Sequence, residues 1–413
     1  MRQRVAIIGG GIGGLTAAHL LRRVHEVTLF ERQPRLGGNA YTLDTPEGWS
    51  IDIGVAAFDR SGYPSFYRLL EELGIRPVLS PGSFVSLHDL DGDDGIYLVP
   101  SLAGLRSVLR PKSLAALARL SRGLARGRRL LEEGALPGLS LGEALSGVRL
   151  IGTARNLLLA VLCLLSSMSG EEVLAAPADF FFAKLRAHSE VLSPRALYSV
   201  RCVKGGTRRY VEALARGLAG QLVLGTAPRR VRRDEQGVEL IFDDGARRFD
   251  AVVFACNADQ SLALLEAPSG RERALLGAWR YREGRVVVHR DLAAMPPRDR
   301  LQAYTFLYRD RDGHFETSVN GCTWRQPGVP ATCDYVSTQH PNFAIRRERI
   351  LLETVLRTPV FDHASCRTIP ELSTLNGRER SYYCGSHFGC GLHEDAVASA
   401  IVVARALGVG PEG

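Results

Sequence analysis

The 413-residue chain is predicted to fold as an α/β protein, and at about 150 residues per domain its length suggests two or three domains. Residues 5–8 (VAII) form a continuous apolar run, as in a parallel strand that is buried on both faces. A glycine-rich turn at 9–14 and a helical pattern at 15–21 follow directly, and a second apolar strand occupies 27–30. A strand, a glycine turn, a helix and a strand in this order predict a Rossmann-like dinucleotide-binding domain.

The glycine-rich turn has the pattern G-x-G-x-x-G at Gly9, Gly11 and Gly14. The first glycine permits the tight turn, the second lets a pyrophosphate approach the backbone, and the third lets the helix pack closely on the strand. The helix would direct its first amide groups and the positive end of its dipole at the phosphates. The second strand ends at Glu31, about twenty residues past the turn, where a carboxylate accepts hydrogen bonds from a ribose. An acid at this position favours FAD or NAD over NADP.

A second glycine segment distinguishes between the cofactors. Arg35, Gly37 and Gly38 form an R-x-G-G pattern, and with it the chain resembles the amine oxidase and phytoene desaturase superfamily of flavoproteins. In that superfamily the segment wraps the pyrophosphate of FAD. Many members have a basic residue where this chain has Asn39, so one phosphate contact is expected to be missing or replaced. The D-I-G segment that ends at Gly54 matches the family segment near the reactive face of the flavin ring.

The resemblance continues in the second half of the chain. A G-G pair within 204–207 opens a helix, a strand pair has its turn at 234–237, and 249–255 returns the chain to the FAD-binding domain. In the family, the residue that matches Val231 pairs its backbone with the adenine. The closing segment, 382–396, resembles the family segment whose glycine approaches the ribityl chain and whose helix points its N-terminus at the flavin.

The resemblance implies a Rossmann-like FAD-binding domain of the amine oxidase (GR2) type with an interleaved α+β substrate domain. The FAD-binding domain is expected to comprise 1–80, 200–260 and 365–413, and the substrate domain 81–199 and 261–364. FAD is expected to be bound non-covalently, because the cysteine motif of covalent relatives is absent. The residues implied in cofactor binding are Gly9, Gly11, Ile12, Gly13, Gly14, Glu31, Arg35, Gly37, Gly38, Asn39, Gly54, Val55, Val231, Gly385, Ser386, Gly391, Leu392 and His393.

The closing segment also contains metal-ligand residue types at every third position, namely Cys384, His387, Cys390 and His393. A zinc site usually draws on two separated pairs of ligands. Here all four residues lie in one glycine-rich segment that the flavin interpretation already explains. We therefore expect no metal site.

The expected reaction begins with the transfer of a hydride from a substrate carbon to flavin N5. Many amine oxidases place a tyrosine of an aromatic cage where this chain has Leu392, and leucine cannot cage an amine. The hypothesis is therefore an FAD-dependent oxidoreductase of the desaturase or oxidase type with an apolar, acyl- or isoprenoid-like substrate. A redox-neutral double-bond isomerase and an amine oxidase, with another residue supplying the cage, stay open as alternatives. A flavin-binding protein without catalytic activity is less favoured.

Four histidines are candidates for a base or a polar anchor. His387 and His393 are the preferred catalytic candidates, because the closing segment should lie near the flavin. His289 and His340 are weaker candidates, because only their residue type suggests a role.

The net charge of +8 is concentrated in one stretch. Residues 101–150 contain nine basic and three acidic residues, and leucines recur among the arginines of 105–131 at helical spacing. Such a helix either rests on an anionic membrane surface or packs its leucines on the core and exposes its basic face. Nucleic-acid binding is not expected, since no recognition fold accompanies the charge.

The compartment is inferred from features that the sequence lacks. The eight cysteines form no C-x-x-C pair, the N-terminus does not resemble a signal peptide, and no apolar run reaches the ~18 residues of a membrane span. The longest run, 157–165, is predicted to be a buried helix. We expect a cytoplasmic protein with reduced thiols, and membrane association through 105–131 stays open.

Overall fold

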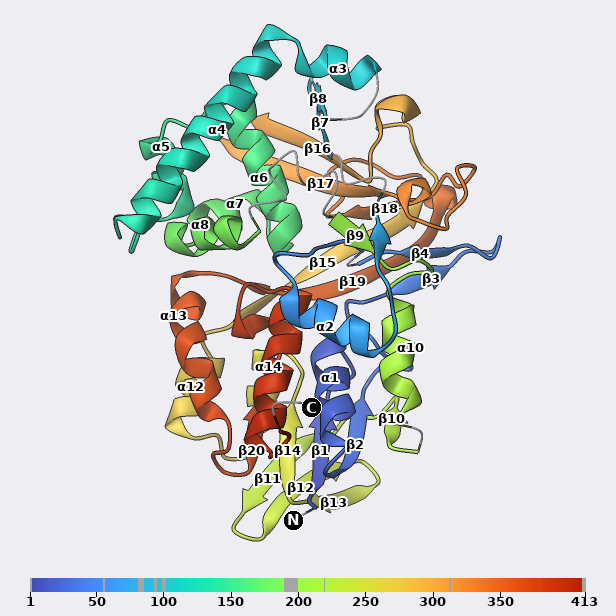
Figure 1. Cartoon of the computed structure of the whole chain (residues 1–413), viewed down its shortest axis with the longest axis vertical. Helices are drawn as coiled ribbons and strands as arrows, with labels where there is room; N and C mark the ends of the chain where they lie inside the picture. The colour runs from blue at the N-terminus through green and yellow to red at the C-terminus, as the bar shows by residue number, and fades with distance from the viewer. Residues whose placement is uncertain are drawn as a thin grey trace.

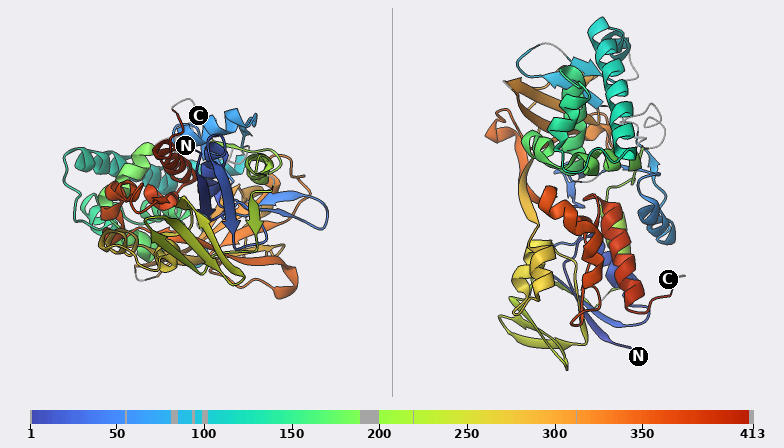
Figure 2. Two further views of the ribbon diagram at one scale, coloured as in Figure 1. Left: turned by 90° about the horizontal axis from the view of Figure 1, so that it is seen from below. Right: turned by 90° about the vertical axis from the view of Figure 1, so that its left-hand side faces the viewer.

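The computed structural model describes residues 2–410 except 55, 81–84, 93–94, 99–101, 189–199, 219 and 312. It is built as two halves that lie one above the other along the longest axis of the molecule (Figure 1). The lower half holds both termini and a parallel sheet, and the upper half holds a larger, mainly antiparallel sheet (Figures 1 and 2). The α/β fold with an interleaved second domain is thereby confirmed.

The central sheet of the lower half contains five strands in the order β10-β2-β1-β14-β20, and every neighbouring pair is parallel. Apolar residues on both faces of β1 explain its central position. Val5 and Ile7 pack towards the helices, whereas Ala6 and Ile8 face a three-stranded sheet. The strands are β1 (Arg4–Ile8), β2 (Glu26–Glu31), β10 (Leu222–Leu224), β14 (Ala251–Phe254) and β20 (Ser381–Tyr383).

Helices cover one face of this sheet and a second sheet covers the other. On the second face, the ring of Phe30 lies 5.0 Å from Phe242 and 5.9 Å from Phe249, centroid to centroid. The predicted strand pair with its turn after Asp234 is confirmed by the register of β11 and β12. The covering elements are the helices α1 (Ile12–Leu21), α10 (Arg208–Arg216) and α14 (His393–Ala406) and the strands β11 (Arg230–Asp234), β12 (Gly237–Phe242) and β13 (Gly245–Phe249).

Further helices belong to the lower half, and one expected domain boundary changes as a result. The sequence places residues 261–276 in the substrate domain, yet they lie beside the parallel sheet (Figure 1). Arg233 of β11 holds them there through Glu272, with an N–O distance of 2.5 Å. The helices are α11 (Ala258–Leu264), α12 (Gly270–Leu276) and α13 (His363–Leu372).

The upper half is built on a seven-stranded sheet in the order β19-β15-β18-β17-β16-β7-β8. Its two longest strands, the edge strand β19 and its neighbour β15, extend down to the lower half (Figure 1). The strands are β7 (Val85–Asp89), β8 (Gly95–Tyr97), β15 (Arg280–His289), β16 (Tyr304–Arg311), β17 (His314–Cys322), β18 (Val336–Gln339) and β19 (Ile350–Val360).

A group of helices packs on this sheet and around it. The predicted buried helix at 157–165 is confirmed within α6, where Leu158, Leu159 and Leu162 are fully buried. No helix in the part of the chain that the structure describes is long and apolar enough to cross a bilayer. The helices are α3 (Leu102–Val108), α4 (Pro111–Glu132), α5 (Leu141–Gly147), α6 (Thr153–Ser166), α7 (Gly170–Ala175) and α8 (Ala178–Ala187).

Short strands, the helix α2 and several 3₁₀ turns lie in the segments that connect the larger elements. They are β3 (Thr42–Asp44), β4 (Ser50–Asp52), β5 (Phe58–Asp59), α2 (Pro64–Glu72), β6 (Val78–Leu79), β9 (Val200–Cys202) and the 3₁₀ turns η1 (Arg298–Arg300), η2 (Thr323–Arg325), η3 (Arg347–Arg349), η4 (Ser373–Leu375) and η5 (Ser386–Phe388).

The basic stretch forms two helices where one amphipathic stretch was expected. Pro111 is the first residue of α4, a position that its fixed φ suits, and it separates this helix from α3. In the middle of α4, Leu120 is buried and Leu117 and Leu124 are half-buried, as a core-facing stripe requires. Leu114 and the leucines of α3 are exposed. The core-facing interpretation therefore holds for most of α4 and fails at α3.

Gly127 lets α4 approach α8 closely. A Cβ atom at this position would lie 2.0 Å from the ring of the buried Phe182. Gly127→Ala should therefore lower the free energy of unfolding by about 1–3 kcal/mol, despite the higher helix propensity of alanine. Gly147→Ala in α5 is the matched control, because its Cβ would contact nothing and should be neutral or stabilising. Urea unfolding of both variants measures the difference, and equal stabilities would contradict the close packing.

The pair of Glu272 and Arg233 should make stability depend on acid pH. Burial alone would raise the pKa of Glu272, but hydrogen bonds from Arg233, Tyr383 and the Ser269 amide lower it to about 2. Since the folded-state pKa is depressed, this contribution is present above pH ~4.5 and is lost as the pH falls towards 2. Glu272→Gln should lower the free energy of unfolding by about 3 kcal/mol at pH 7, and by progressively less as the pH falls.

Denaturant unfolding of wild type and Glu272→Gln at several pH values measures how the difference between their free energies of unfolding shrinks in acid. The control is Glu371→Gln, which removes the exposed partner of Arg271 and should cost less than about 1 kcal/mol at every pH. If the free energies of unfolding of wild type and Glu272→Gln differ by the same amount at every pH, the ionised carboxylate is not the stabilising group.

Candidate functional site

A cavity of about 1340 Å³ lies between the two halves, and both of them line it. Pockets for single small ligands are usually about 300–1,000 Å³, so this one has room for a large cofactor and a second molecule. Its lower part is made of glycine turns and the ends of parallel strands, and its upper part is mostly apolar. The upper lining is Val85, Leu98, Leu105, Val108, Leu117, Leu120, Leu157, Val161, Leu164, Leu165, Val286 and Leu356 with the polar or aromatic residues Asp59, Tyr63, Ser166, Ser167, Tyr304, Gln339, His340 and Thr358.

The turn after β1 forms the lower end of the cavity. A Cβ atom on Gly14 would lie 1.9 Å from the carbonyl oxygen of Gly9, so α1 packs against the turn at a distance that only glycine permits. A Cβ atom on Gly11 would meet no protein atom within 4 Å, because Gly11 lines the cavity. The open space in front of Gly11 faces the first residues of α1, Ile12 and Gly13, which also line the cavity. A helix N-terminus behind such a space fits a pyrophosphate.

Glu31 ends β2 beside this turn and is held by two backbone amides. Its Oε2 accepts a hydrogen bond from Gly10 N at 2.6 Å and its Oε1 accepts one from Gln33 N at 2.8 Å. A carboxylate has about four acceptor positions, so two remain for ribose hydroxyls on the cavity side.

The R-x-G-G segment lies directly against the glycine turn. Gly37 N donates to the carbonyl of Gly10 at 2.8 Å, and Gly37 pairs with Gly11 in an isolated parallel bridge. Arg35 donates to the carbonyl of Gly38 at 2.9 Å and stacks on Tyr41. Two glycine segments that are separated in the sequence but adjacent in space therefore form one cradle.

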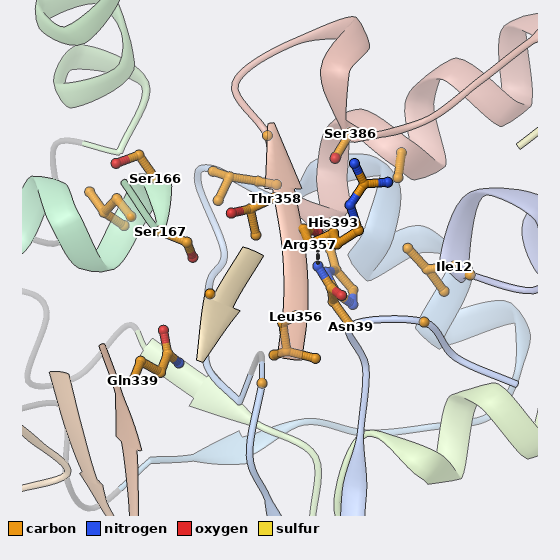
Figure 3. A pocket seen from close by; sticks show the side chains of 18 of the residues that line it. Ile12, Asn39, Ser166, Ser167, Gln339, Leu356, Arg357, Thr358, Ser386 and His393 are labelled. Atoms are coloured by element: carbon orange, nitrogen blue, oxygen red, sulfur yellow. Dashed lines mark hydrogen bonds between the residues drawn. The ribbon is translucent and has the colours of Figure 1, made fainter. Parts of the chain in front are cut away.

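Asn39 replaces the basic residue of many relatives and makes a structural contact. Its Nδ2 donates to the backbone carbonyl of Arg357 on β19 at 3.0 Å, which ties the cradle to the upper half (Figure 3). A Cβ atom on Gly54 would lie 2.1 Å from the Asn39 carbonyl, so this segment also requires glycine. Both residues line the cavity.

The closing segment supplies the opposite wall. Gly385, Ser386, Gly391, Leu392 and His393 all line the cavity, and α14 begins at His393. The helices α14 and α1 lie side by side and begin at the same end of the sheet (Figure 1). Two helix N-termini therefore direct positive dipole ends towards the cavity.

The structure brings together fifteen of the eighteen cofactor-binding residues that the sequence indicates. Gly14 lies behind the wall, where it packs α1 on the turn. Val231 is buried on β11 and is not one of the lining residues, and its carbonyl accepts a hydrogen bond from Glu266 N. Residues 227–229, just before it, line the cavity instead, and Val55 lies outside the described residues. Sequence reasoning also missed Cys256, Asn257 and Gln260, which follow β14.

The two preferred catalytic histidines both line the cavity and both are buried. Burial lowers the pKa of His387 to about 3 and that of His393 to about 4, so both rings are neutral at pH 7. His393 Nε2 lies 3.0 Å from the hydroxyl of Tyr210, whereas His387 Nε2 has no partner among the described residues. A ring with so low a pKa is a weak proton acceptor and acts better as a hydrogen-bonding group.

A polar group on the upper wall faces the cradle. Ser166, Ser167, Gln339 and Thr358 surround the cavity there (Figure 3). Ser167 and His340 both have left-handed backbones, with φ values of 54° and 51°. Such conformations cost energy in residues other than glycine and cluster at functional sites. The sequence offers His340 only as a weaker histidine candidate, and no sequence pattern marks left-handed serine or histidine, so its grouping with Ser167 could not be predicted.

The charged groups beside the upper cavity are paired. Asp59 Oδ1 lies 3.0 Å from His188 Nδ1, and Asp59 also accepts hydrogen bonds from Ser61 Oγ and Gly62 N. Burial would raise the pKa of Asp59, but the contact with His188 outweighs it and holds the pKa below its ordinary value. Among the described residues, no group of three or more His, Cys, Asp or Glu side chains could hold a metal ion.

Comparison with known proteins agrees with this geometry. The chain is 28% identical over 263 residues to AofH of Mycobacterium tuberculosis, a candidate flavin-containing monoamine oxidase, and the match covers 61% of this chain and 56% of AofH. It is 38% identical over 72 residues to zeta-carotene desaturase of Zea mays, which covers 17% of this chain and 12% of the desaturase. The chain thus spans only about half the length of the first relatives it matches.

Solved structures share the fold over almost the whole chain. The fatty acid isomerase from P. acnes that produces CLA superposes with a TM-score of 0.70 at 18% identity and 98% coverage of both chains. A variant of putrescine oxidase superposes with a TM-score of 0.71 at 16% identity, again with 98% coverage of both. The sequence profile of the flavin-containing amine oxidoreductases matches residues 12–281, more than half of the chain. The chain therefore belongs to the flavin-containing amine oxidoreductase family.

Proposed function

We propose that this flavoprotein is an FAD-dependent oxidoreductase that removes a hydride from a C–H bond of an apolar, acyl- or isoprenoid-like molecule. One observation carries the proposal: a single cavity runs from a dinucleotide cradle into a pocket walled by leucines and valines of α3, α4 and α6. A shorter polar substrate would leave this wall facing water, which is costly for apolar surface.

FAD supplies a hydride acceptor, flavin N5, when it is bound. The open space at Gly11 and the carboxylate of Glu31 suit its pyrophosphate and ribose, and the N-terminus of α14 favours negative charge at the facing wall. We further propose that FAD is bound non-covalently. Burial raises the pKa of Cys256, a thiol that lines the cavity, to about 11, so it is protonated and a poor nucleophile.

The residues of the upper wall would orient the substrate and exclude water. The apolar side chains hold the chain of the substrate, while Ser167, Gln339 and His340 offer hydrogen bonds at one point of the wall. Burial lowers the pKa of His340 to about 4, so its neutral ring adds no charge to the pocket. A hydride donor carbon held in a dry, apolar pocket is protected from side reactions with water.

Two alternatives have support of their own. A redox-neutral isomerase of an unsaturated chain would need the same pocket, and one solved structure with this fold is a fatty acid isomerase. An amine oxidase is favoured by Tyr63 and Tyr304, which line the upper cavity and could flank an amine. The amine hypothesis is weakened by Asp59, because this carboxylate is already paired with His188.

Gly11→Ala should separate cofactor binding from folding. The added methyl group would enter the open space at the cradle, so affinity for FAD should fall at least tenfold. The free energy of unfolding of the apoprotein should stay within about 1 kcal/mol of the wild-type value. Gly270→Ala, at the start of α12 and away from the cavity, is the matched control and should leave affinity unchanged. Flavin fluorescence titration measures both, and unchanged affinity in Gly11→Ala would refute the placement of the pyrophosphate.

The reaction class is tested by mixing the holoprotein with unsaturated fatty acids, carotenoid precursors and amines without oxygen. An oxidase or desaturase should bleach the flavin with its apolar substrate, and products should appear at one equivalent per flavin. An isomerase should shift double bonds over many turnovers while the flavin spectrum returns to the oxidised form. Rapid bleaching by amines alone would overturn the proposal in favour of an amine oxidase.

A further inference from the structure

We propose that the corner formed by α3 and the start of α4 docks on an anionic phospholipid bilayer, and that the apolar substrate passes from the bilayer into the cavity there. The docking face is defined as Leu102, Leu105, Leu109, Leu114, Arg106 and Arg110. The passage of substrate rests on the proposed function, whereas docking itself does not.

The leucines of the docking face are unusually exposed. Leu102, Leu105 and Leu109 expose 74%, 54% and 57% of their surfaces, and their spacing of three and four residues places them on one side of α3 and its C-terminal end. Leu114 adds an exposed fraction of 46% one turn into α4. Four exposed leucines within this short stretch form a patch, whereas single exposed apolar residues need no explanation.

Two arginines of the docking face have no acidic partner in the part of the chain that the structure describes. Both Arg106 and Arg110 are exposed, and no ion pair joins either of them to a carboxylate among the described residues. Some exposed arginines elsewhere do have a carboxylate partner, as in Arg229 with Asp243 and Arg248 with Asp234. Within the described ranges of the chain, no carboxylate therefore compensates the charge of Arg106 and Arg110. Basic residues around apolar ones are the composition that binds anionic lipid surfaces.

The docking face is continuous with the cavity. Leu105 is half exposed and also lines the cavity, together with Gly104 and Val108 of the same helix. Leu117 and Leu120 continue the lining along α4. An apolar molecule could thus move from the acyl region of a bilayer along leucines to the cradle without crossing water.

The position of the corner in the molecule suits peripheral docking. The helices α3 and α4 form the end of the upper half that lies farthest from both termini (Figures 1 and 2). A bilayer at this end would not obstruct the nucleotide cradle in the lower half. An acidic protein could satisfy the arginines, but it would not explain why Leu105, exposed among other leucines, also lines an apolar cavity.

Co-sedimentation of the FAD-loaded protein with vesicles tests the docking. We expect binding to vesicles of phosphatidylglycerol and phosphatidylcholine at low salt, weaker binding at high salt, and little binding to phosphatidylcholine alone. Arg106→Gln/Arg110→Gln should weaken binding about 25-fold, since each basic residue near the surface contributes about fivefold. Arg209→Gln/Arg216→Gln on α10 removes the same charge from an exposed helix of the lower half and should have little effect.

Leu102→Ser/Leu109→Ser tests the apolar component and should also weaken binding at least tenfold, while Val402→Ser, an exposed residue of α14, should not. Both variants should keep a wild-type flavin spectrum, which shows that they are folded. The docking proposal is overturned if the protein does not bind anionic vesicles at low salt. It is also overturned if Arg209→Gln/Arg216→Gln weakens binding as much as Arg106→Gln/Arg110→Gln does. Binding without turnover of any apolar substrate would refute the proposed function and leave the docking face standing.

Discussion

The close approach of α1 to the turn after β1 is the constraint on which the site depends. Because Gly14 has no Cβ, the helix can start within contact of the Gly9 carbonyl, where any larger residue would overlap it. That start places Gly11 at the cavity surface and directs the first amides of α1 outward. The R-x-G-G segment then pairs with Gly11, so both halves of the cradle take their position from one helix–strand contact.

The upper half is held to this cradle by amide and carboxylate contacts of high specificity. The side-chain amide of Gln326 both accepts from the backbone N–H of Asp52 at 2.9 Å and donates to its carbonyl at 3.0 Å. The carboxylate of Asp52 accepts hydrogen bonds from Thr42 Oγ1 and from the amide and hydroxyl of Thr207. Buried polar groups satisfied in this way specify one arrangement of the chain. These contacts join the two halves beside the cavity.

Local patterns in the sequence predicted the cradle, and contacts between distant segments limited what else could be predicted. Glycine spacing, apolar runs and Glu31 are local signals, so the turn, its flanking strands and the acid follow from the residues alone. The position of Ser167 and His340 at the cavity depends on left-handed backbone outside glycine, which has no sequence signature. The family resemblance assigns Val231 to the adenine, yet its carbonyl is taken by Glu266, a long-range contact that only the fold reveals.

The division of the cavity into a polar and an apolar part has a consequence for how substrate and cofactor meet. The phosphates and ribose of a dinucleotide need donors and a carboxylate, and these lie in the lower half around Gly11 and Glu31. The proposed hydride transfer would need a dry environment around bound FAD, and the leucines of α6 that line the cavity would help to exclude water. An apolar substrate of the proposed kind would be poorly soluble in water. Leu105 is half exposed and also lines the cavity, so in the proposed docking it would join the lipid-facing surface of α3 to the apolar wall.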